Sequence, residues 1–333
     1  MNAAQAGRLP IALTCGEPAG IGPEIAAKAW VALRADLPFA VIGDARHFTG
    51  FGVPVARVPA PADALHVFAN ALPVLDNPFP APATPGRPTT ENAQSVINVI
   101  ARGADLVSKG KARALTTAPI HKKALQDGAG FRFPGHTEYL AHLTGTDRVV
   151  MMLASDLLRV VATTIHIPLA EVPRTLTPEL LGDTIRITAA GLAQDLGIKR
   201  PRLAVAGLNP HAGEGGAIGR EDIEVIAPVI AALAAEGLAV TGPHSADTLF
   251  HAAARRRYDA VVAMYHDQAL IPIKTLAFET GVNVTLGLPF VRTSPDHGTA
   301  LDIAGTGQAD PQSLIEALKR ADEMACTRAR YTG

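Results

Sequence analysis

Three histidines in the second half of the chain, His166, His211 and His266, share one sequence context. Each closely follows an apolar run that is typical of a buried strand, and these runs are residues 158–164, 203–207 and 259–264. The separations of 45 and 55 residues are too long for a zinc finger and match one or two strand–helix units. Ligands of open α/β sheets bind beyond the carboxyl ends of the strands, so neighbouring strands would bring these imidazoles into one site. Three imidazoles with an open position suit a catalytic divalent metal.

A second group of polar residues follows His266. Asp267 is adjacent to it, and Lys274, Asn283 and Arg292 come further along the chain. A cation, an amide and a guanidinium that converge suit a small anionic ligand, because arginine binds phosphate or carboxylate through two parallel hydrogen bonds. A histidine and a carboxylate after a strand are also typical of a capped turn, so the pattern alone leaves both interpretations open.

Two further pairs of residues have alternative interpretations. A proline–glycine turn leads into His136 and Thr137, where Thr137 either caps the helix that follows or contacts a substrate together with His136. His121 and Lys122 follow a predicted strand and either serve an anionic substrate or lie at a solvated helix N-terminus.

The elements that must position these residues alternate between strands and helices, which predicts an α/β fold with largely parallel sheets. The predicted strands are residues 11–15, 39–42, 113–117, 149–153, 158–164, 203–207, 259–264 and 282–286, with 149–153 and 158–164 as a hairpin or strand pair. The predicted helices are residues 24–35, a segment from 91 onward, 178–196, 221–235, 245–257 and 310–330. Gly197 is expected to end the helix 178–196, and the proline-rich segment 54–87 is expected to form loops with short strands.

Composition bounds the class of protein. The 333 residues predict one large or two moderate domains, and the net charge of −1 favours neither nucleic acid nor an anionic membrane surface as a partner. The two cysteines, Cys15 and Cys326, form no metal or redox motif, and with no signal pattern they favour the cytoplasm. The longest apolar stretch, residues 226–240, is too short and interrupted to span a bilayer.

A glycine-rich turn over residues 16–24 follows the first predicted strand and leads into a helix. A helix N-terminus after such a turn favours anions. The spacing nevertheless fails the dinucleotide-binding fingerprint, because Gly20-Ile21-Gly22 is followed by Pro23 and Glu24 with no third glycine. A standard Rossmann site is therefore disfavoured.

Taken together, the motifs resemble the family of 4-hydroxythreonine-4-phosphate dehydrogenases, enzymes of pyridoxal phosphate biosynthesis, over nearly the whole chain. The matching stretches are residues 16–24, 133–138, 206–215, 264–268, 283–289, 292–294 and 297–302. Two of them, 20–24 and 297–305, also resemble the isocitrate and isopropylmalate dehydrogenases, whose fold binds NAD without a Rossmann fingerprint.

The resemblance implies roles for particular residues. It implies divalent-metal ligands at His166, His211 and His266, and substrate contacts at His136, Thr137, Lys274, Asn283 and Arg292. Beyond the resemblance, we hypothesise catalytic roles for His136, Asp267 and Lys274, in which His136 or Asp267 moves the hydroxyl proton or orients a ligand histidine, and we expect NAD contacts at His297, Gly298, Thr299 and Asp302.

The implied fold has two α/β/α domains around a cleft, similar to isocitrate and isopropylmalate dehydrogenases and unlike a standard Rossmann fold. The expected first domain, on the NAD side, is residues 1–135 with about 296–333, and the second, with the metal site and dimer contacts, is about 136–295. The implied assembly is a homodimer with shared active sites, without nucleic acid or membrane.

The implied reaction is NAD-dependent, and possibly NADP-dependent, oxidation of 4-phosphooxy-L-threonine to 2-amino-3-oxo-4-phosphooxybutanoate, followed by decarboxylation to 3-amino-2-oxopropyl phosphate. One zinc, magnesium, cobalt or manganese ion per site is expected. The alternatives are a related dehydrogenase acting on another phosphorylated hydroxy acid or an aromatic cis-diol, a non-catalytic metal- or phosphate-binding protein, and histidines that only cap loops.

Overall fold

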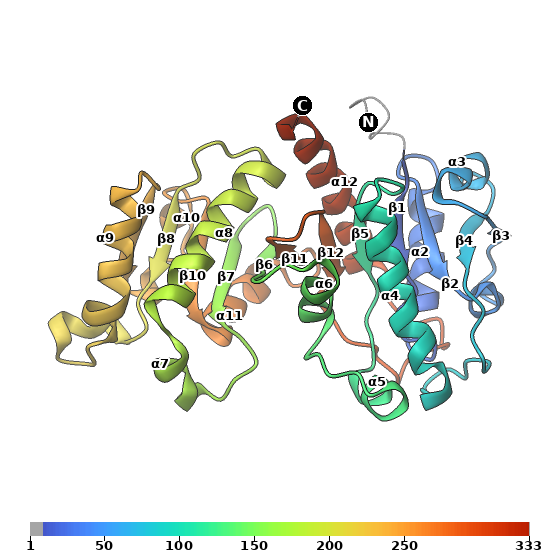
Figure 1. The fold of residues 1–333 in the computed structure, drawn as a ribbon, viewed down its shortest axis with the longest axis horizontal. Helices are drawn as coiled ribbons and strands as arrows, with labels where there is room; N and C mark the ends of the chain where they lie inside the picture. The colour runs from blue at the N-terminus through green and yellow to red at the C-terminus, as the bar shows by residue number, and fades with distance from the viewer. Residues whose placement is uncertain (1–8, 333) are drawn as a thin grey trace. The chain divides into compact units, whose positions relative to one another are not determined.

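The computed structural model describes residues 9–332, which form two α/β units (Figure 1). Unit 1 comprises the chain up to Asp147 and from Leu288 onward, and unit 2 is Arg148–Gly287. The expected domain boundaries near 135 and 296 therefore differ from the divisions between the units. Helix α6 (His136–Thr144) falls in unit 1 because it packs against α4, and strand β12 (Arg292–Pro295) does so because it pairs with β5.

Unit 1 contains six parallel strands in the order β3-β4-β2-β1-β5-β12. Besides β12, the strands are β1 (Ile11–Thr14), β2 (Phe39–Gly43), β3 (Val55–Arg57), β4 (Leu72–Asp76) and β5 (Leu115–Thr117). Strand β1 lies between β2 and β5, so the direction in which strands are added reverses at β1. In open α/β sheets such a reversal opens a crevice at the carboxyl ends of the strands. The glycine-rich turn after β1 begins at that position.

Helices cover both faces of the unit 1 strands. Besides α6, they are α2 (Gly22–Leu33), α3 (Ala64–Val67), α4 (Ala93–Ser108), α5 (Lys122–Ala129) and α12 (Gln312–Thr332). Helix α4 packs on β1, β2 and β5, while α12 packs on β12 and β5 and against α2. The strands β1 and β2 are completely buried between these layers, which explains their unbroken apolar sequences.

Unit 2 contains six strands in the order β11-β6-β7-β10-β8-β9. They are β6 (Val150–Ala154), β7 (Arg159–Thr164), β8 (Leu203–Ala206), β9 (Val240–His244), β10 (Ala260–Tyr265) and β11 (Val282–Leu286). Strands β7, β10, β8 and β9 are parallel, whereas β6 pairs antiparallel with both β7 and β11. The predicted strand pair at 149–153 and 158–164 is confirmed as the hairpin β6–β7.

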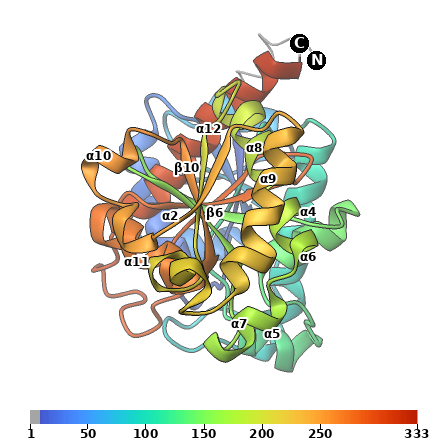
Figure 2. The same ribbon diagram turned by 90° about the vertical axis from the view of Figure 1, so that its left-hand side faces the viewer.

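The helices of unit 2 are α7 (Val172–Thr175), α8 (Pro178–Leu196), α9 (Ala227–Ala235), α10 (Ala252–Arg255) and α11 (His266–Ala277). Figure 2 shows α8 and α9 on one side of the strands, and α10 and α11 on the other. Between the strands and α11 lies a buried apolar cluster, which includes Val261 and Ala263 of β10 and Leu270 and Ile273 of α11. Helix α8 has the predicted bounds, and Gly197 ends it with a left-handed φ of 73°.

One prediction about local structure is wrong, and one of the two interpretations of Thr137 is excluded. The helix predicted over 245–257 is a 3-10 turn at Ala246–Thr248 and the single-turn helix α10. Thr137 does not cap α6, because the N-cap is Gly135 and no side chain caps the helix there. Gly135 has an extended backbone and no side chain that could cap the helix. The helix begins at His136, so Thr137 lies in its first turn. Across residues 9–332, the helices are too short or too polar to cross a bilayer.

Candidate functional site

The three histidines lie beyond the ends of strands that are direct neighbours. Strand β10 pairs in parallel with β7 on one side and with β8 on the other. His166 follows the end of β7 by two residues, and His266 directly follows β10 as the first residue of α11. His211 follows β8 by five residues. The condition under which the three imidazoles could share one site, that their strands are neighbours, is therefore met.

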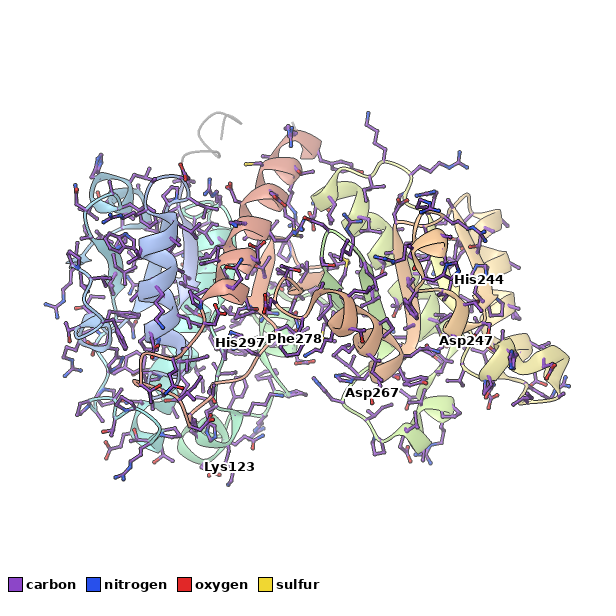
Figure 3. The ribbon with its side chains drawn as sticks, turned by 180° about the vertical axis from the view of Figure 1, so that it is seen from behind. Lys123, His244, Asp247, Asp267, Phe278 and His297 are labelled. Carbon is purple, nitrogen blue, oxygen red and sulfur yellow. The ribbon has the colours of Figure 1, made fainter. Side chains whose placement is uncertain are left out.

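The rings of His166 and His266 lie close together and are tilted by 41° relative to one another. Their centroids are 5.8 Å apart, and both side chains line a cavity of about 280 Å³ together with Tyr265 and Asp267. The Nδ1 atom of His266 lies 2.7 Å from Oδ1 of Asp267, which stands at the start of α11 (Figure 3). A carboxylate on one ring nitrogen fixes the orientation of an imidazole and directs its other nitrogen, Nε2, toward a ligand.

His211 lies on an unusual turn, residues 210–216. Residues 211–215 all have positive φ, from 44° to 79°, so the chain makes a short left-handed turn. Only glycine adopts this conformation without strain, yet His211, Ala212 and Glu214 occupy three of the five positions. His166 also has a positive φ, of 55°. Such strain persists where the surrounding structure enforces it, and it gathers at functional sites.

The fit of this region to a divalent metal rests on its donor chemistry. Within residues 9–332, no three His, Cys, Asp or Glu side chains are already grouped as a metal would require. Two of the three imidazoles nevertheless converge on one cavity, and one of them has the carboxylate partner that metal-binding histidines usually have. The donor set therefore fits a divalent metal, with His211 on the neighbouring strand end.

A buried guanidinium is the central feature of unit 1. Arg292, the first residue of β12, is 3% exposed and donates from Nη2 to Oγ1 of Thr117 over 2.7 Å. Burial lowers the pKa of Arg292 to about 10, and the carboxylate of Glu138 partly opposes that shift. Arg292 remains charged at neutral pH. A buried cation of this kind is a strong binding element for an anion.

His136 completes this group. Burial, and then the positive charges of Arg292 and Lys122, lower the pKa of His136 well below its ordinary value. Its imidazole is therefore neutral at pH 7, and its Nε2 atom is buried without a hydrogen-bond partner among the described residues. The structure thus brings His136 and Arg292 together at the N-terminus of α6, where the helix dipole also favours an anion.

Two of the other predicted substrate residues, Asn283 and Lys274, lie in unit 2. Asn283 is on β11, opposite Leu153 of β6. Lys274 is in the last turn of α11, and its Nζ lies 5.8 Å from the ring centroid of Phe278, which follows that helix (Figure 3).

His121 is the N-cap of α5, since its Nδ1 accepts the N–H of Ala124 at 3.2 Å. That contact favours the capping interpretation for His121.

The predicted NAD loop, residues 297–302, packs against the glycine-rich turn of unit 1. The N–H of Ile21 donates to the carbonyl of Thr299 over 3.0 Å. A Cβ atom on Gly20 would lie 2.8 Å from that carbonyl oxygen, so this glycine permits a close backbone approach. The departure from the dinucleotide-binding fingerprint thus has a structural reason, because the glycine-rich turn contacts the backbone of its own chain at Thr299. His297 lies on the same loop after β12 (Figure 3).

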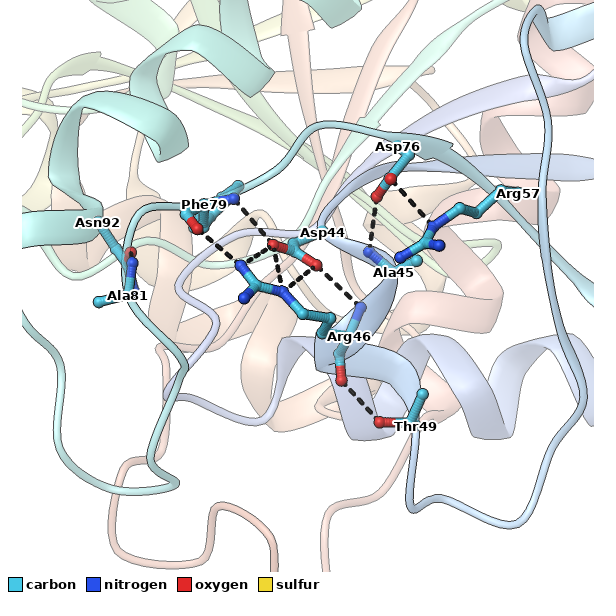
Figure 4. A network of polar contacts seen from close by, with 9 residues as sticks. All are labelled: Asp44, Ala45, Arg46, Thr49, Arg57, Asp76, Phe79, Ala81 and Asn92. Carbon is cyan, nitrogen blue, oxygen red and sulfur yellow. Dashed lines mark hydrogen bonds and ion pairs between the residues drawn. The ribbon is translucent and has the colours of Figure 1, made fainter.

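The residue after β2 is also unsuited to a Rossmann site. Dinucleotide-binding folds commonly use an acidic residue near this position for the ribose hydroxyls. Here Asp44 is 1% exposed and accepts hydrogen bonds from Arg46 and from the N–H of Phe79 at 2.8 Å (Figure 4). Burial raises the pKa of Asp44, but these hydrogen bonds outweigh burial and hold the pKa well below its usual range. This carboxylate therefore has a structural role, which its sequence context did not reveal.

Several residues around the histidines carried no functional assignment from sequence. Thr164, Asp222 and Gln268 form hydrogen bonds between the strand ends. The only sequence signal was the position of Gln268 within the Tyr-His-Asp-Gln motif. Thr164 ends an ordinary β-branched strand, and Asp222 looks like a solvated residue at a helix start.

Comparison with known proteins identifies the family. Residues 29–321 match the family described as pyridoxal phosphate biosynthetic protein PdxA. A 4-hydroxythreonine-4-phosphate dehydrogenase from Ruegeria sp. (strain TM1040) is 63% identical over 318 residues, which are 96% of this chain and 97% of that protein. The crystal structure of 4-hydroxythreonine-4-phosphate dehydrogenase from Klebsiella pneumoniae has a TM-score of 0.88 and 41% identity, covering 95% of this chain and 99% of that one.

A terephthalate 1,2-cis-dihydrodiol dehydrogenase from Burkholderia xenovorans LB400 is a more distant structural neighbour. It has a TM-score of 0.66 and 30% identity, with 95% of this chain and 98% of that chain covered. The family match spans most of the chain and includes the His136–Arg292 group and all three strand-end histidines. This chain therefore belongs to the family of the pyridoxal phosphate biosynthetic protein PdxA.

Proposed function

We propose that this chain oxidises the C3 hydroxyl of 4-phosphooxy-L-threonine with NAD and that the resulting 2-amino-3-oxo-4-phosphooxybutanoate loses CO₂ to give 3-amino-2-oxopropyl phosphate. The observation that carries this proposal is the buried Arg292 guanidinium beside a half-buried, neutral His136 whose Nε2 atom is buried. A phosphorylated substrate supplies the anion that such a group binds. The name shared by relatives at 63% and 61% identity supports the same reaction.

Arg292, His136 and Thr137 bind the anionic substrate in this proposal. The Thr117 bond leaves the guanidinium oriented, and an oriented planar donor loses little freedom when it grips phosphate or carboxylate. The N-terminal turn of α6 adds its dipole. Lys274 and Asn283 are assigned as a cation and an amide that orient the substrate so that its C3 hydrogen faces the nicotinamide.

His166, His211 and His266 would hold one divalent metal ion. The strained backbone at His166 and His211 supports this assignment, since the chain maintains an unfavourable conformation at both positions. When bound, such an ion supplies Lewis acidity, which lowers the pKa of a hydroxyl group and favours loss of CO₂ from a β-keto acid. Zinc, magnesium, cobalt and manganese are all candidates for the resident ion.

The proton of the C3 hydroxyl requires an acceptor when the C3 hydrogen leaves as hydride to NAD. We assign this role to His136, because its depressed pKa keeps the imidazole neutral and able to accept a proton. Asp267 instead orients His266 through their 2.7 Å contact. If Asp267→Asn retains metal affinity and turnover, that role is wrong.

NAD contacts are assigned to His297, Gly298, Thr299 and Asp302 on the loop that packs against Gly20 and Ile21. NAD is favoured over NADP because no basic cluster follows this motif in the sequence. A direct comparison of KM for the two nucleotides tests that preference.

We further propose a homodimer in which each active site takes residues from both subunits. Sedimentation equilibrium should give twice the mass of the 34.6 kDa chain. Mixing the inactive variants His266→Ala and Arg292→Ala should restore part of the activity if both subunits contribute to one site. A fully active monomer would contradict this arrangement.

The deciding experiment measures NADH formation from 4-phosphooxy-L-threonine after a chelator has stripped the protein, and again after a divalent metal is returned. Turnover that disappears and then returns supports the substrate and the metal together. Metal binding without turnover would keep the metal site and reject this substrate. Turnover that survives complete stripping would reject the metal requirement.

A second candidate function is oxidation of an aromatic cis-diol, which the similarity to the Burkholderia xenovorans enzyme supports. Terephthalate cis-dihydrodiol carries carboxylates that Arg292 would also bind. The same NADH assay with this diol discriminates the two, since the proposed function requires a higher kcat/KM for the phosphorylated substrate.

A further inference from the structure

We propose that Thr164, Gln268 and Asp222 are positioning residues that lock the three histidine-bearing strand ends of unit 2 into one arrangement. The inference rests on the proposed function, because it concerns the metal site formed by His166, His211 and His266. Each of the three residues joins elements that are far apart in the sequence.

Thr164 ties β7 to β10. Its Oγ1 donates to the main-chain carbonyl of Met264 over 2.8 Å, and both residues are buried. These two residues stand two positions before His166 and His266, respectively. The hydroxyl therefore fixes the ends of the two strands just before their histidines, in a bond that water does not replace.

Gln268 ties β10 to β8. Its Oε1 accepts the N–H of Met264 at 2.7 Å, while its Nε2 donates to the carbonyl of Gly207 at 2.7 Å. The bond to Met264 uses the amide that begins the turn into α11, and the bond to Gly207 uses the carbonyl just after β8. The amide of Gln268 makes both bonds at once, because its oxygen accepts a hydrogen bond while its nitrogen donates one.

Asp222 holds the chain that leads from β8 to His211. Its carboxylate accepts the N–H groups of Leu208 at 2.8 Å and Asn209 at 3.2 Å, and also Nδ2 of Asn209 at 2.9 Å. Asp222 is 1% exposed, and hydrogen bonds from these three donors offset the cost of burying its carboxylate. A Cβ atom on Gly207 would lie 2.6 Å from Oδ1 of Asp222, so glycine is what lets the carboxylate approach.

These contacts form a connected set that runs from β7 through Met264 and Gln268 to Gly207, and from there along the chain to the residues held by Asp222. Each bond fixes backbone two to four residues before a histidine, while the histidines themselves are left to meet a ligand. Partners that orient metal-binding histidines in this way typically contribute about 10- to 100-fold to metal affinity. We expect the same range for the loss of one link.

The test titrates Co²⁺ into the chelator-stripped full chain and records its visible spectrum, because that spectrum reports coordination geometry without any catalytic turnover. Gln268→Leu and Thr164→Val should each weaken Co²⁺ affinity about 10- to 100-fold and change the spectrum. Thr164→Ser keeps the hydroxyl and should retain the wild-type affinity and spectrum. Far-UV circular dichroism establishes that each variant is folded.

Thr188→Val is the matched control. Thr188 is a fully buried threonine of unit 2 whose Oγ1 donates to the carbonyl of Thr184 within α8, so its removal deletes a comparable bond that joins no strand ends. Its Co²⁺ affinity should equal that of the wild type. If Gln268→Leu does not fold, the pair Thr164→Val and Thr164→Ser decides the question alone.

The outcomes separate the inference from the function on which it rests. Wild-type Co²⁺ affinity and spectrum in folded Gln268→Leu and Thr164→Val would overturn the positioning role while leaving the metal site intact. An equal loss in Thr188→Val would also overturn it, because the effect would then reflect general destabilisation. A wild-type chain that binds no Co²⁺ would instead reject the proposed metal site, and the positioning role with it.

Discussion

Arg292 donates a hydrogen bond from Nη2 to Oγ1 of Thr117 over 2.7 Å, between the first residue of β12 and the last residue of β5. The strands are parallel, with Arg292 opposite Leu115, so the side chain reaches two residues further along β5 to Thr117. The bond therefore sets a charged guanidinium in a fixed direction near His136. That arrangement is the basis of the first prediction.

Arg292→Lys should reduce kcat/KM for the phosphorylated substrate about 10- to 100-fold, mainly through a higher KM, because an ammonium is a point charge that cannot reproduce two parallel hydrogen bonds. Steady-state kinetics with varied substrate provide the measurement. Arg102→Lys is the control, since Arg102 of the same unit donates to the carbonyl of Asp76 over 2.9 Å and has no proposed ligand. An unchanged KM in Arg292→Lys would refute the anion-binding role.

The stability of the protein should fall in acid because of His136. Its pKa in the folded state is depressed by burial and then by Arg292 and Lys122, from an ordinary value of 6.5. Below pH 6.5 the unfolded chain therefore binds a proton that the folded chain rejects, and the free energy of unfolding falls by up to about 1.4 kcal/mol per pH unit until the folded-state pKa is reached. Above pH 6.5 this contribution is fully present.

Urea denaturation of the wild type and His136→Gln at pH 7.5 and pH 5.5 measures this effect. The variant should lose less stability between the two pH values than the wild type. Burial also lowers the pKa of His47, so the difference between the two proteins, rather than the wild-type slope alone, isolates His136. Equal slopes would mean that His136 titrates normally in the folded protein.

Gly207→Ala should destabilise the protein by about 1–3 kcal/mol, because the added Cβ would overlap with packed atoms. The methyl carbon would lie 2.6 Å from Oδ1 of Asp222 and 2.9 Å from the main-chain Cα of Ala212. Thermal or urea denaturation provides the measurement.

Gly182→Ala is the control for this substitution. Gly182 is inside α8, where the new Cβ would meet only the flexible end of Arg186 at 3.2 Å and Val229 at 3.9 Å. Alanine there should stabilise the protein by about 0.5–1 kcal/mol, since glycine weakens a helix. Similar losses in both variants would show that the close approach at Gly207 is not responsible.

Lys28→Met should raise the KM for NAD more than the KM for the phosphorylated substrate. Lys28 of α2 donates to the carbonyls of Gly307 and Ala309 at 2.8 and 2.6 Å, and it also pairs with Glu24. These bonds anchor the segment that follows the proposed NAD loop, so their loss should loosen that loop.

The matched control is Lys109→Met, in which the lysine also pairs with an acidic residue four positions earlier, Asp105, and that pair is exposed. Exposed pairs contribute only about 0–1 kcal/mol, so this variant should behave like the wild type. If Lys28→Met raises the two KM values equally, the anchor has no specific connection to the nucleotide.

The sequence alone determined the alternation of strands and helices and where its charged and imidazole groups stand along the chain. Apolar periodicity is a local property, so helix α8 with its stop at Gly197 and the hairpin β6–β7 followed from it directly. The histidines after β7, β8 and β10 were predictable for the same reason, since a strand end is visible as an abrupt change from apolar to polar residues.

The tertiary structure determines which strands and side chains are neighbours in space. Only the order of the strands shows that β10 separates β7 from β8, which brings His166 and His266 within 5.8 Å between ring centroids. The pKa of His136 depends on burial beside Arg292, a residue 156 positions away in the sequence. Asp222 and Gln268 act through backbone groups of other elements, and a backbone amide has no sequence signature. Their role is therefore fixed by packing, which the local pattern of residue types does not encode.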